Sequence, residues 1–226
     1  MEIAKIETID GLYKAYHDDV TPLLAYVESE LAEFPIAILN EIRSLHDHIA
    51  RACLSKSIEA KCKEIESARR HIVRIKLDCC KVLCVLGESR MEEFHKNYRK
   101  IRLGEVDNGN FLPELTQLHD KARKLVQSAK EAEKSGKDGQ EETVTLFQEA
   151  VISYKLVEQF IERKSKELAW SASRQRRYFW SSLLIGFFIG VVIGYISIGM
   201  SSHLIGLLIG VATGCISTWI MHKILK

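Results

Sequence analysis

Basic side chains recur at helical spacing between residues 56 and 102 and are well suited to bind an anion. Lys63, Arg70, Arg74 and Lys81 are separated by 7, 4 and 7 positions, so a helix places them on one face, with Arg69 adjacent. Ammonium and guanidinium groups bind phosphates through charge-assisted hydrogen bonds. This basic stripe predicts binding of a nucleic acid, a nucleotide or a lipid headgroup. The alternative is that it forms the solvated face of a helix.

The patterns of known catalytic and metal sites are absent from the sequence. It contains no phosphate loop, no G-x-G-x-x-G, no G-x-S-x-G and no H-E-x-x-H. His46 and His48 are two positions apart, so on a helix they point away from each other and are expected at the surface. Cys62, Cys79 and Cys215 fit apolar positions and are interpreted as reduced core thiols, whereas Cys80 and Cys84 with a histidine could form a zinc element, which is the less favoured possibility. We therefore expect a non-enzyme without a metal or cofactor.

The elements that must position these residues are easiest to recognise at the carboxyl end. Two apolar runs, residues 179–197 and 204–221, contain no Asp, Glu, Lys or Arg. Each is close to the roughly 20 residues that a helix needs to cross a bilayer. A six-residue connector, 198–203, forces the two helices to be antiparallel. The sequence thus predicts a transmembrane hairpin over residues 178–226, in contact with membrane lipids.

The predicted hairpin is an internal repeat with an offset of 20 residues, and 11 positions of residues 181–200 recur in 201–220. Both copies carry glycines four positions apart, which leaves a groove along one helix face. Such rows resemble glycine zippers, which let helix backbones approach closely in lipid. The rows either pack subunits of an oligomer together or face each other within one hairpin. Their members are Gly186, Gly190, Gly194, Gly206, Gly210 and Gly214.

Basic residues on both sides of the predicted hairpin set its orientation. By the positive-inside rule, both ends of the hairpin face the cytosol. Tyr178, Trp180 and Trp219 would form an aromatic belt at that face. An apolar signal segment is not seen at the start of the sequence, so the N-terminus is also expected in the cytosol. The flanking bases are Arg163, Lys164, Lys166, Arg174, Arg176, Arg177, Lys223 and Lys226.

The rest of the chain is predicted to be helical, which makes the fold class all-α. Apolar residues recur three and four positions apart, and no run alternates long enough to indicate a sheet. We expect a cytosolic helical domain over residues 1–140, with a break or kink at Gly87 and a loop at 104–112. Residues 141–177 are expected to form a stalk helix that packs on this domain and leads into the membrane.

The predicted stalk has two further properties. No helix breaker separates Glu141 from Tyr178, so a rigid rod could run straight into the first membrane helix; alternatively it only holds the domain at the surface. Its apolar residues also have heptad-like spacing, which allows a coiled coil with a sister chain. These residues are Val144, Phe147, Val151, Tyr154 and Ile161.

A helical domain followed by a glycine-rich hairpin is similar to the membrane effectors of bacterial anti-phage systems. The layout resembles the channel-type effector of Hailong defence, with residues 35–45 (PIAILNEIRSL) as matching family sequence. The resemblance implies a homotetramer in the bacterial inner membrane. It also implies that the cytosolic domain binds single-stranded DNA oligomers that hold the channel shut.

Two functions remain open at this stage. In the first, the protein is an oligomeric membrane effector or channel gated by an anionic ligand or a partner. In the second, it is a hairpin-anchored adaptor whose helical domain holds partner proteins at the membrane. The doubled glycine rows favour the channel. The helix pair with residues 129–136 (AKEAEKSG) and 146–154 (LFQEAVISY), which resembles a single tetratricopeptide or microtubule-interacting helical hairpin, favours the adaptor.

Overall fold

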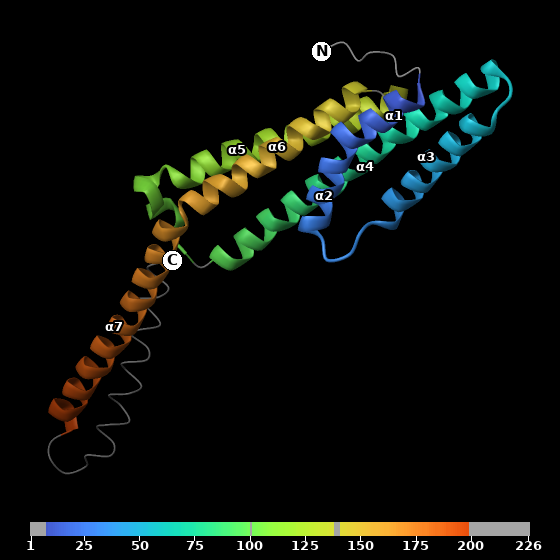
Figure 1. The fold of residues 1–226 in the computed structure, drawn as a ribbon. Coiled ribbons are helices and arrows are strands. Elements are labelled where there is room, and N and C mark those ends of the chain that lie inside the picture. Colours follow the sequence, from blue (N-terminus) through green and yellow to red (C-terminus); the bar gives the residue numbers. More distant parts are fainter. Residues whose placement is uncertain (1–7, 100, 138–140, 199–226) are drawn as a thin grey trace. The chain divides into compact units, whose positions relative to one another are not determined.

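A computed structural model describes residues 8–99, 101–137 and 141–198 of the chain. These residues form helices and no strands, so the all-α prediction is confirmed (Figure 1). The chain divides into two compact units: unit 1 is Met1–Arg99 with Leu112–Glu162, and unit 2 is Lys100–Phe111 with Arg163–Lys226. The helices are α1 (Ile9–Ala15), η1 (Tyr16–Val20), α2 (Thr21–Glu30), α3 (Ile36–Leu54), α4 (Ile58–Tyr98), η2 (Leu103–Gly109), α5 (Phe111–Ala132), η3 (Glu133–Lys137), α6 (Glu141–Arg163) and α7 (Ser165–Ile198).

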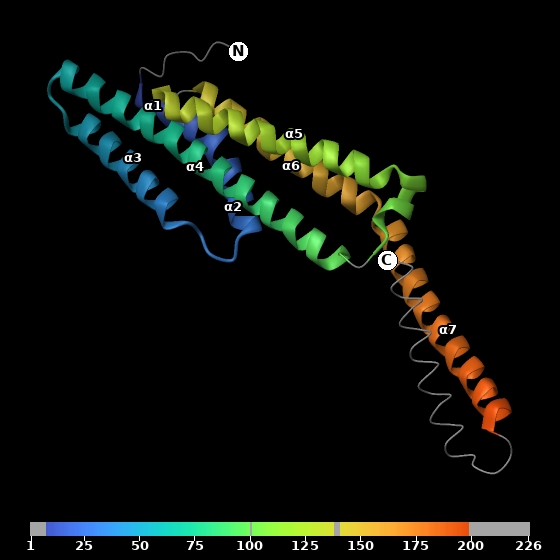
Figure 2. The same cartoon turned by 180° about the vertical axis from the view of Figure 1, so that it is seen from behind.

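Unit 1 is built around α4, which contributes to two separate apolar clusters. Ile65, Ile72 and Ile75 of α4 pack with residues of α1, α2 and α3. On another face of the same helix, Val73 and Leu77 pack with residues of α5 and α6. Figures 1 and 2 show α4 between α3 and the α5–α6 pair. Two apolar stripes on one helix are what a central helix needs, since it is covered on both sides.

The predicted break at Gly87 is wrong, because α4 continues through this residue to Tyr98. A Cβ atom added at Gly87 would lie 2.6 Å from Cγ of the Tyr154 side chain. Such a distance is far inside van der Waals contact, so only glycine allows Tyr154 of α6 to pack this closely on α4. The residue serves helix packing and does not end the helix.

The heptad-like residues of α6 lie inside unit 1. Val144, Phe147 and Tyr154 are buried in the cluster that α6 shares with α4 and α5. They are therefore not available to a sister chain, and the coiled-coil prediction for this stripe is wrong. Period alone could not distinguish the two cases, since a helix that packs on its own domain has the same spacing.

The predicted uninterrupted rod from Glu141 to Tyr178 is also wrong. Helix α6 ends at Arg163 and α7 begins at Ser165. At the break, Lys164 forms ion pairs with Asp107 at 2.9 Å and with Glu167 at 3.3 Å. Unit 1 ends at Glu162, so α6 belongs to unit 1 and α7 to unit 2. The chain thus divides at a place other than the predicted 140/141 boundary.

Unit 2 contains η2 and the 34-residue helix α7. Its buried apolar residues include Val106, Phe111 and Leu168. Further along, large apolar side chains of α7 are exposed, among them Leu184, Phe188 and Val192. Helix α7 covers the first predicted membrane segment, residues 179–197, and Gly194 lies within it.

Within the part of the chain that the structure describes, no helix combines the length and the apolarity that a membrane crossing requires. The predicted hairpin is therefore not confirmed. Its second segment, residues 204–221 with Gly206, Gly210 and Gly214, lies outside the described residues.

Candidate functional site

The predicted basic stripe lies along α4, and three of its five members are free to meet a ligand. Lys63, Arg70 and Arg74 are exposed. Arg70 donates a hydrogen bond to Ser67 Oγ at 2.9 Å, which leaves most of its guanidinium donors unused. From residue 63 to residue 74 the helix rises by about 16 Å. This length would allow the row to contact more than one phosphate group of a polymer.

The other two members are engaged within unit 1. Arg69 donates to both carboxylate oxygens of Glu66, at 3.1 and 3.2 Å. This hydrogen bonding raises the pKa of Arg69, although burial opposes the shift. Lys81 forms an ion pair with Glu133, and its Nζ lies 5.9 Å from the centre of the Phe147 ring. The structure thus reduces the candidate anion site from five residues to three.

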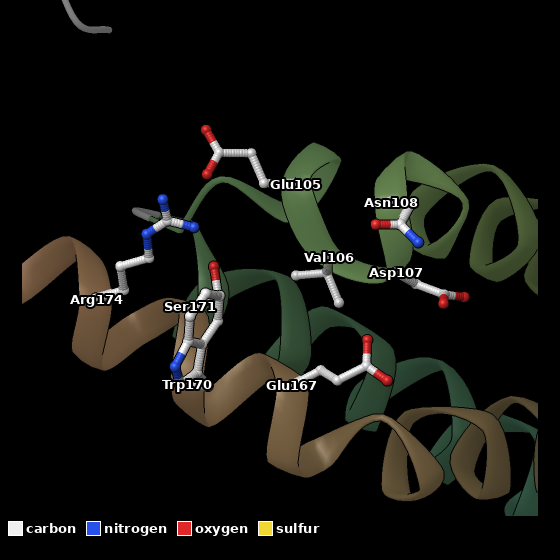
Figure 3. A pocket seen from close by; sticks show the side chains of 8 residues that line it. All are labelled: Glu105, Val106, Asp107, Asn108, Glu167, Trp170, Ser171 and Arg174. Carbon is white, nitrogen blue, oxygen red and sulfur yellow. The ribbon is translucent and has the colours of Figure 1, made fainter.

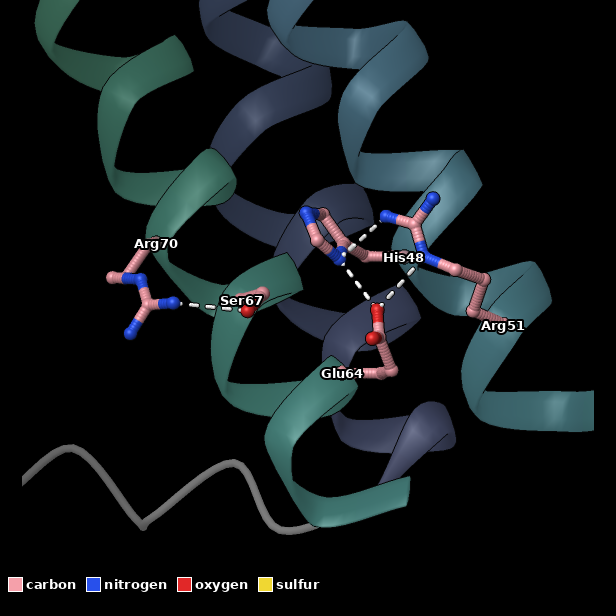
Figure 4. A network of polar contacts seen from close by, with 5 residues as sticks. All are labelled: His48, Arg51, Glu64, Ser67 and Arg70. Carbon is pink, nitrogen blue, oxygen red and sulfur yellow. Dashed lines mark hydrogen bonds and ion pairs between the residues drawn. The ribbon is translucent and has the colours of Figure 1, made fainter. Parts of the chain in front are cut away.

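A second group of polar side chains joins α3 to α4 (Figure 4). His48 Nδ1 lies 2.6 Å from Glu64 Oε2, and Arg51 Nε donates to the same oxygen at 3.0 Å. The hydrogen bond with His48 and then that with Arg51 lower the pKa of Glu64. His48 was expected at the surface, but its side chain is only 21% exposed. That expectation is wrong, because the partners of His48 come from the neighbouring helix and from the next turn of α3.

The proton on His48 Nδ1 decides which of two hydrogen bonds this nitrogen makes. Arg51 Nη2 also lies 2.8 Å from the same nitrogen. A guanidinium can only donate, so Nδ1 accepts from Arg51 when it carries no proton. When it is protonated, it donates to Glu64 instead. The network therefore holds a carboxylate and a guanidinium close together and has two hydrogen-bonding states.

A matching pair lies beside this network. His71 Nδ1 of α4 is 2.6 Å from Glu41 Oε2 of α3. The rings of His48 and His71 are stacked, with centroids 5.1 Å apart and planes inclined by 26°. Each imidazole thus has its own carboxylate, and together they fasten α3 to α4. In Figure 4 Arg70 is bonded to Ser67 alone among the residues drawn, and no hydrogen bond or ion pair joins it to His48, Arg51 or Glu64.

Three cysteines of α4 have the properties of core thiols, but Cys62 is exposed, so its predicted core position is wrong, and Cys215 lies outside the described residues. Cys79, Cys80 and Cys84 are buried, and burial is the main cause that raises the pKa of each to about 12. They are therefore protonated at neutral pH and are weak ligands and nucleophiles. Among the described residues, no three His, Cys, Asp or Glu side chains converge in a way that could hold a metal ion.

A third network, which the sequence did not suggest, joins α4, α5 and α6. Glu88 accepts hydrogen bonds from Tyr154 Oη at 2.8 Å and from His119 Nε2 at 2.9 Å. Burial acts to raise the pKa of Glu88, but these hydrogen bonds and the nearby charges outweigh it and the pKa is lowered. Burial and the bond to Glu88 raise the pKa of Tyr154. No signal in the sequence links residues 88, 119 and 154, since only packing brings them together.

The chain was compared with protein-family models, with curated protein sequences and with solved structures, and no match was found. The site must therefore be interpreted from its own geometry. The exposed row Lys63, Arg70 and Arg74 can bind an anion, whereas the histidine and Glu88 networks hold helices together.

Proposed function

We propose that the protein is an oligomeric membrane protein of the channel or pore type. The observation that carries the proposal is the distribution of exposure along α7. Gly186 and Gly190 are buried, whereas the large apolar residues around them are 41–65% exposed. These exposed residues are Leu184, Ile185, Phe187, Phe188, Ile189 and Val192.

This distribution is the reverse of that in a water-soluble domain. A helix in water buries its large apolar side chains, because their exposure costs about 25 cal/mol per Å². In lipid that cost disappears, and helices associate where small residues allow close contact. The proposal further depends on the apolar segments 179–197 and 204–221 of the sequence, the second of which lies outside the described residues.

The proposed role of unit 1 is to sense an anionic ligand through Lys63, Arg70 and Arg74. A single-stranded nucleic acid or a nucleotide would suit this row, as the resemblance to the anti-phage effectors implies. Because the three side chains are exposed, binding should weaken steeply as salt rises. The protein proposed here is thus a ligand-gated defence effector in the inner membrane. Because it is an oligomer, each subunit contributes one copy of the basic row.

The first experiment is to measure membrane potential in bacteria with a voltage-sensitive dye after induced expression. Depolarisation should disappear in the Gly190→Leu/Gly210→Leu variant, because leucine prevents close helix contact. Gly104→Leu is the control, since a Cβ at Gly104 would meet nothing within 4 Å. Depolarisation that persists in the double variant at equal expression would show that the glycine rows are not the assembly surface.

Ligand binding requires its own variant. Arg70→Glu with Arg74→Glu should lower the affinity for a labelled single-stranded oligonucleotide by at least about tenfold. Lys121→Glu with Lys124→Glu makes the same change of charge on exposed residues of α5 and should have little effect. Equal losses of affinity in both variants would mean that binding depends only on net charge. An unchanged affinity in the Arg70/Arg74 variant would show that the stripe is not the binding site.

A membrane-anchored adaptor is the second candidate function, and exposed apolar residues of unit 1 favour it. Leu54 and Ile58, on either side of the α3–α4 turn, are both 82% exposed, and Ile36 is 74% exposed. Exposed apolar residues of this size are frequent at protein-binding surfaces. Under this function the dye assay would detect no depolarisation, even after deletion of residues 1–140.

A further inference from the structure

Unit 2 contains a pocket of about 310 Å³ between η2 and the first turns of α7 (Figure 3). Val106 is its buried apolar floor. The polar residues that line it include three carboxylates and one guanidinium, beside an indole ring that is 56% exposed. These residues are Glu105, Asp107, Asn108, Glu167, Trp170 and Arg174.

The charges of the pocket are arranged with a cation at one end. Figure 3 shows Arg174 and Glu105 at one end and Asp107 and Glu167 at the other. The Arg174 guanidinium lies 5.0 Å from the centre of the Trp170 ring and 5.3 Å from that of Tyr178. It also donates to Tyr178 Oη at 3.2 Å. This hydrogen bond is the main cause that raises the pKa of Arg174, so the group is a permanent cation fixed between two rings.

The carboxylates have partners that leave part of their acceptor capacity unused. Lys164 pairs with both Asp107 and Glu167, and Arg102 pairs with Glu105 at 3.1 Å. A carboxylate can accept about four hydrogen bonds. The four charged residues of the lining itself carry three negative charges and one positive charge. Lys164 and Arg102 balance two of these negative charges, so a ligand that fits is neutral overall, with a hydrogen-bonding cation for the unused acceptor positions and an anion for Arg174.

The backbone conformation of η2 supports a binding role for the side of the pocket that η2 forms. Asp107 and Asn108 have φ angles of 54° and 53°, in the left-handed region that costs energy for residues with a side chain. Both residues line the pocket. Strained residues persist where the surrounding structure fixes them, and they concentrate at binding sites.

The position of the pocket along α7 indicates where such a ligand would come from. Arg174 precedes the apolar run at Phe179 by five residues, or about 7.5 Å of helix, and Trp170 precedes it by about 13.5 Å. The headgroup layer on each side of a bilayer is about 5–7.5 Å thick. If α7 enters the membrane at Phe179, Arg174 and Tyr178 lie at the level of lipid phosphates and Trp170 lies just beyond them.

We propose that this pocket binds a phosphoethanolamine group, with its phosphate on Arg174 and Tyr178 and its ammonium between Trp170 and Glu105. The lipid phosphatidylethanolamine is the source that the position on α7 favours, and in this respect the inference rests on the proposed membrane function. A primary ammonium can donate to the unused acceptor positions of Glu105, which lies at the same end of the pocket as Arg174 (Figure 3), and it is attracted to an indole ring. Choline has no N–H group and could make no hydrogen bond to this carboxylate. A simple polyamine would leave Arg174 without an anion.

The experiment is to purify the full chain in mild detergent and to count retained lipids by native mass spectrometry. The sample is first equilibrated with equal amounts of phosphatidylethanolamine and phosphatidylcholine. Wild type should retain phosphatidylethanolamine at least about tenfold better, as expected for charge-assisted hydrogen bonds. Arg174→Gln and Trp170→Leu should each reduce this preference by about fivefold or more. The matched controls, Arg176→Gln and Trp180→Leu, remove the same types of side chain from α7 outside the pocket and should keep the preference.

The outcomes separate this inference from the membrane function. If the chain fractionates with membranes but retains both lipids equally, the pocket assignment is overturned and the membrane function is untouched. If the chain is not found in membranes, soluble glycerophosphoethanolamine is the probe, by ligand-detected NMR. Binding that Arg174→Gln abolishes would then support the ligand chemistry and exclude the lipid source, and an absence of binding would overturn the inference. An equal loss of the phosphatidylethanolamine preference in the control variants Arg176→Gln and Trp180→Leu would also overturn the pocket assignment.

Discussion

Helices α4 and α7 are both long, and both contain glycines in their interiors, but they bury opposite kinds of residues. In α4 the large apolar side chains are inside, and Gly87 is the point where Tyr154 approaches the backbone. In α7 the glycines 186 and 190 are buried and the large apolar side chains are outside. The difference is what the proposed function requires, since under it the exposed face of α7 meets an apolar environment, whereas α4 packs inside a helical domain.

The comparison also separates two uses of charged residues. In unit 1, most carboxylates that have partners pair with bases from other helices and so fasten the fold, as Glu41, Glu64 and Glu88 do. In unit 2, the carboxylates of η2 and α7 line a pocket together with Trp170 and Arg174. The pairs of unit 1 hold helices together, whereas the acids of unit 2, although paired with Lys164 and Arg102, also line a cavity.

The largest effect is expected from placing a charge on the exposed apolar face of α7. Phe188 and Val85 are similarly exposed, at 65% and 71%. Phe188→Lys should cost about 3 kcal/mol of membrane insertion, whereas Val85→Lys on α4 should change stability by less than about 0.5 kcal/mol. The measurement is the fraction of chain that resists extraction from membranes. Equal behaviour of the two variants would show that α7 faces water, as α4 does.

A smaller effect is expected at the glycine of α4. Gly87→Ala would place a methyl group against Tyr154, and such overpacking costs about 1–3 kcal/mol. The better helix propensity of alanine offsets about 1 kcal/mol of this cost. Urea denaturation of the full chain in detergent would measure the net loss. Gly104→Ala is the control, because a Cβ there would meet nothing within 4 Å; a loss as large as that of Gly87→Ala would refute the close-contact explanation.

The smallest effect is expected from acid. The hydrogen bonds from His48 and Arg51 keep the pKa of Glu64 below its ordinary value of 4.5. Because the folded state binds this proton less readily than the unfolded state, the group stabilises the fold above 4.5 and loses that contribution as pH falls through its lowered pKa.

Thermal unfolding between about pH 6 and pH 3 would test this dependence. The Glu64→Gln variant should lose less stability over this window than wild type. Glu149→Gln on the exposed side of α6 is the matched control and should follow the wild-type curve. If Glu64→Gln also follows that curve, Glu64 does not couple the α3–α4 pair to pH.

The sequence predicted well those features that repeat along one helix. Apolar spacing identified the helices, and buried residues of α4 such as Ile65, Ile72 and Cys79 follow it, whereas Ile58 and Cys62 on the same stripe are exposed. The same periodicity predicted the wrong partner for α6, because a stripe specifies a buried face and not what covers it. The prediction of a break at Gly87 was wrong because the residue that requires glycine there, Tyr154, is 67 positions away in the chain.

The candidate sites divide in the same way. The exposed row Lys63, Arg70 and Arg74 could be predicted, because its members belong to one helix and the helical period places them on one face. The sequence could not predict that Lys81 is paired within unit 1, since its partner Glu133 is 52 positions away. The partner of Arg69, in contrast, is Glu66 on the same helix.

The sequence by itself determined the helical class, the basic row and the apolar glycine-rich segments, all of which are local and periodic. The tertiary structure alone decided the partners of His48, His71 and Glu88 and the pocket of residues 105–108 and 167–174. The reason is physical: a helix fixes the spacing of its own residues within a few turns. The neighbours of a side chain across an interface depend on the packing of the whole unit.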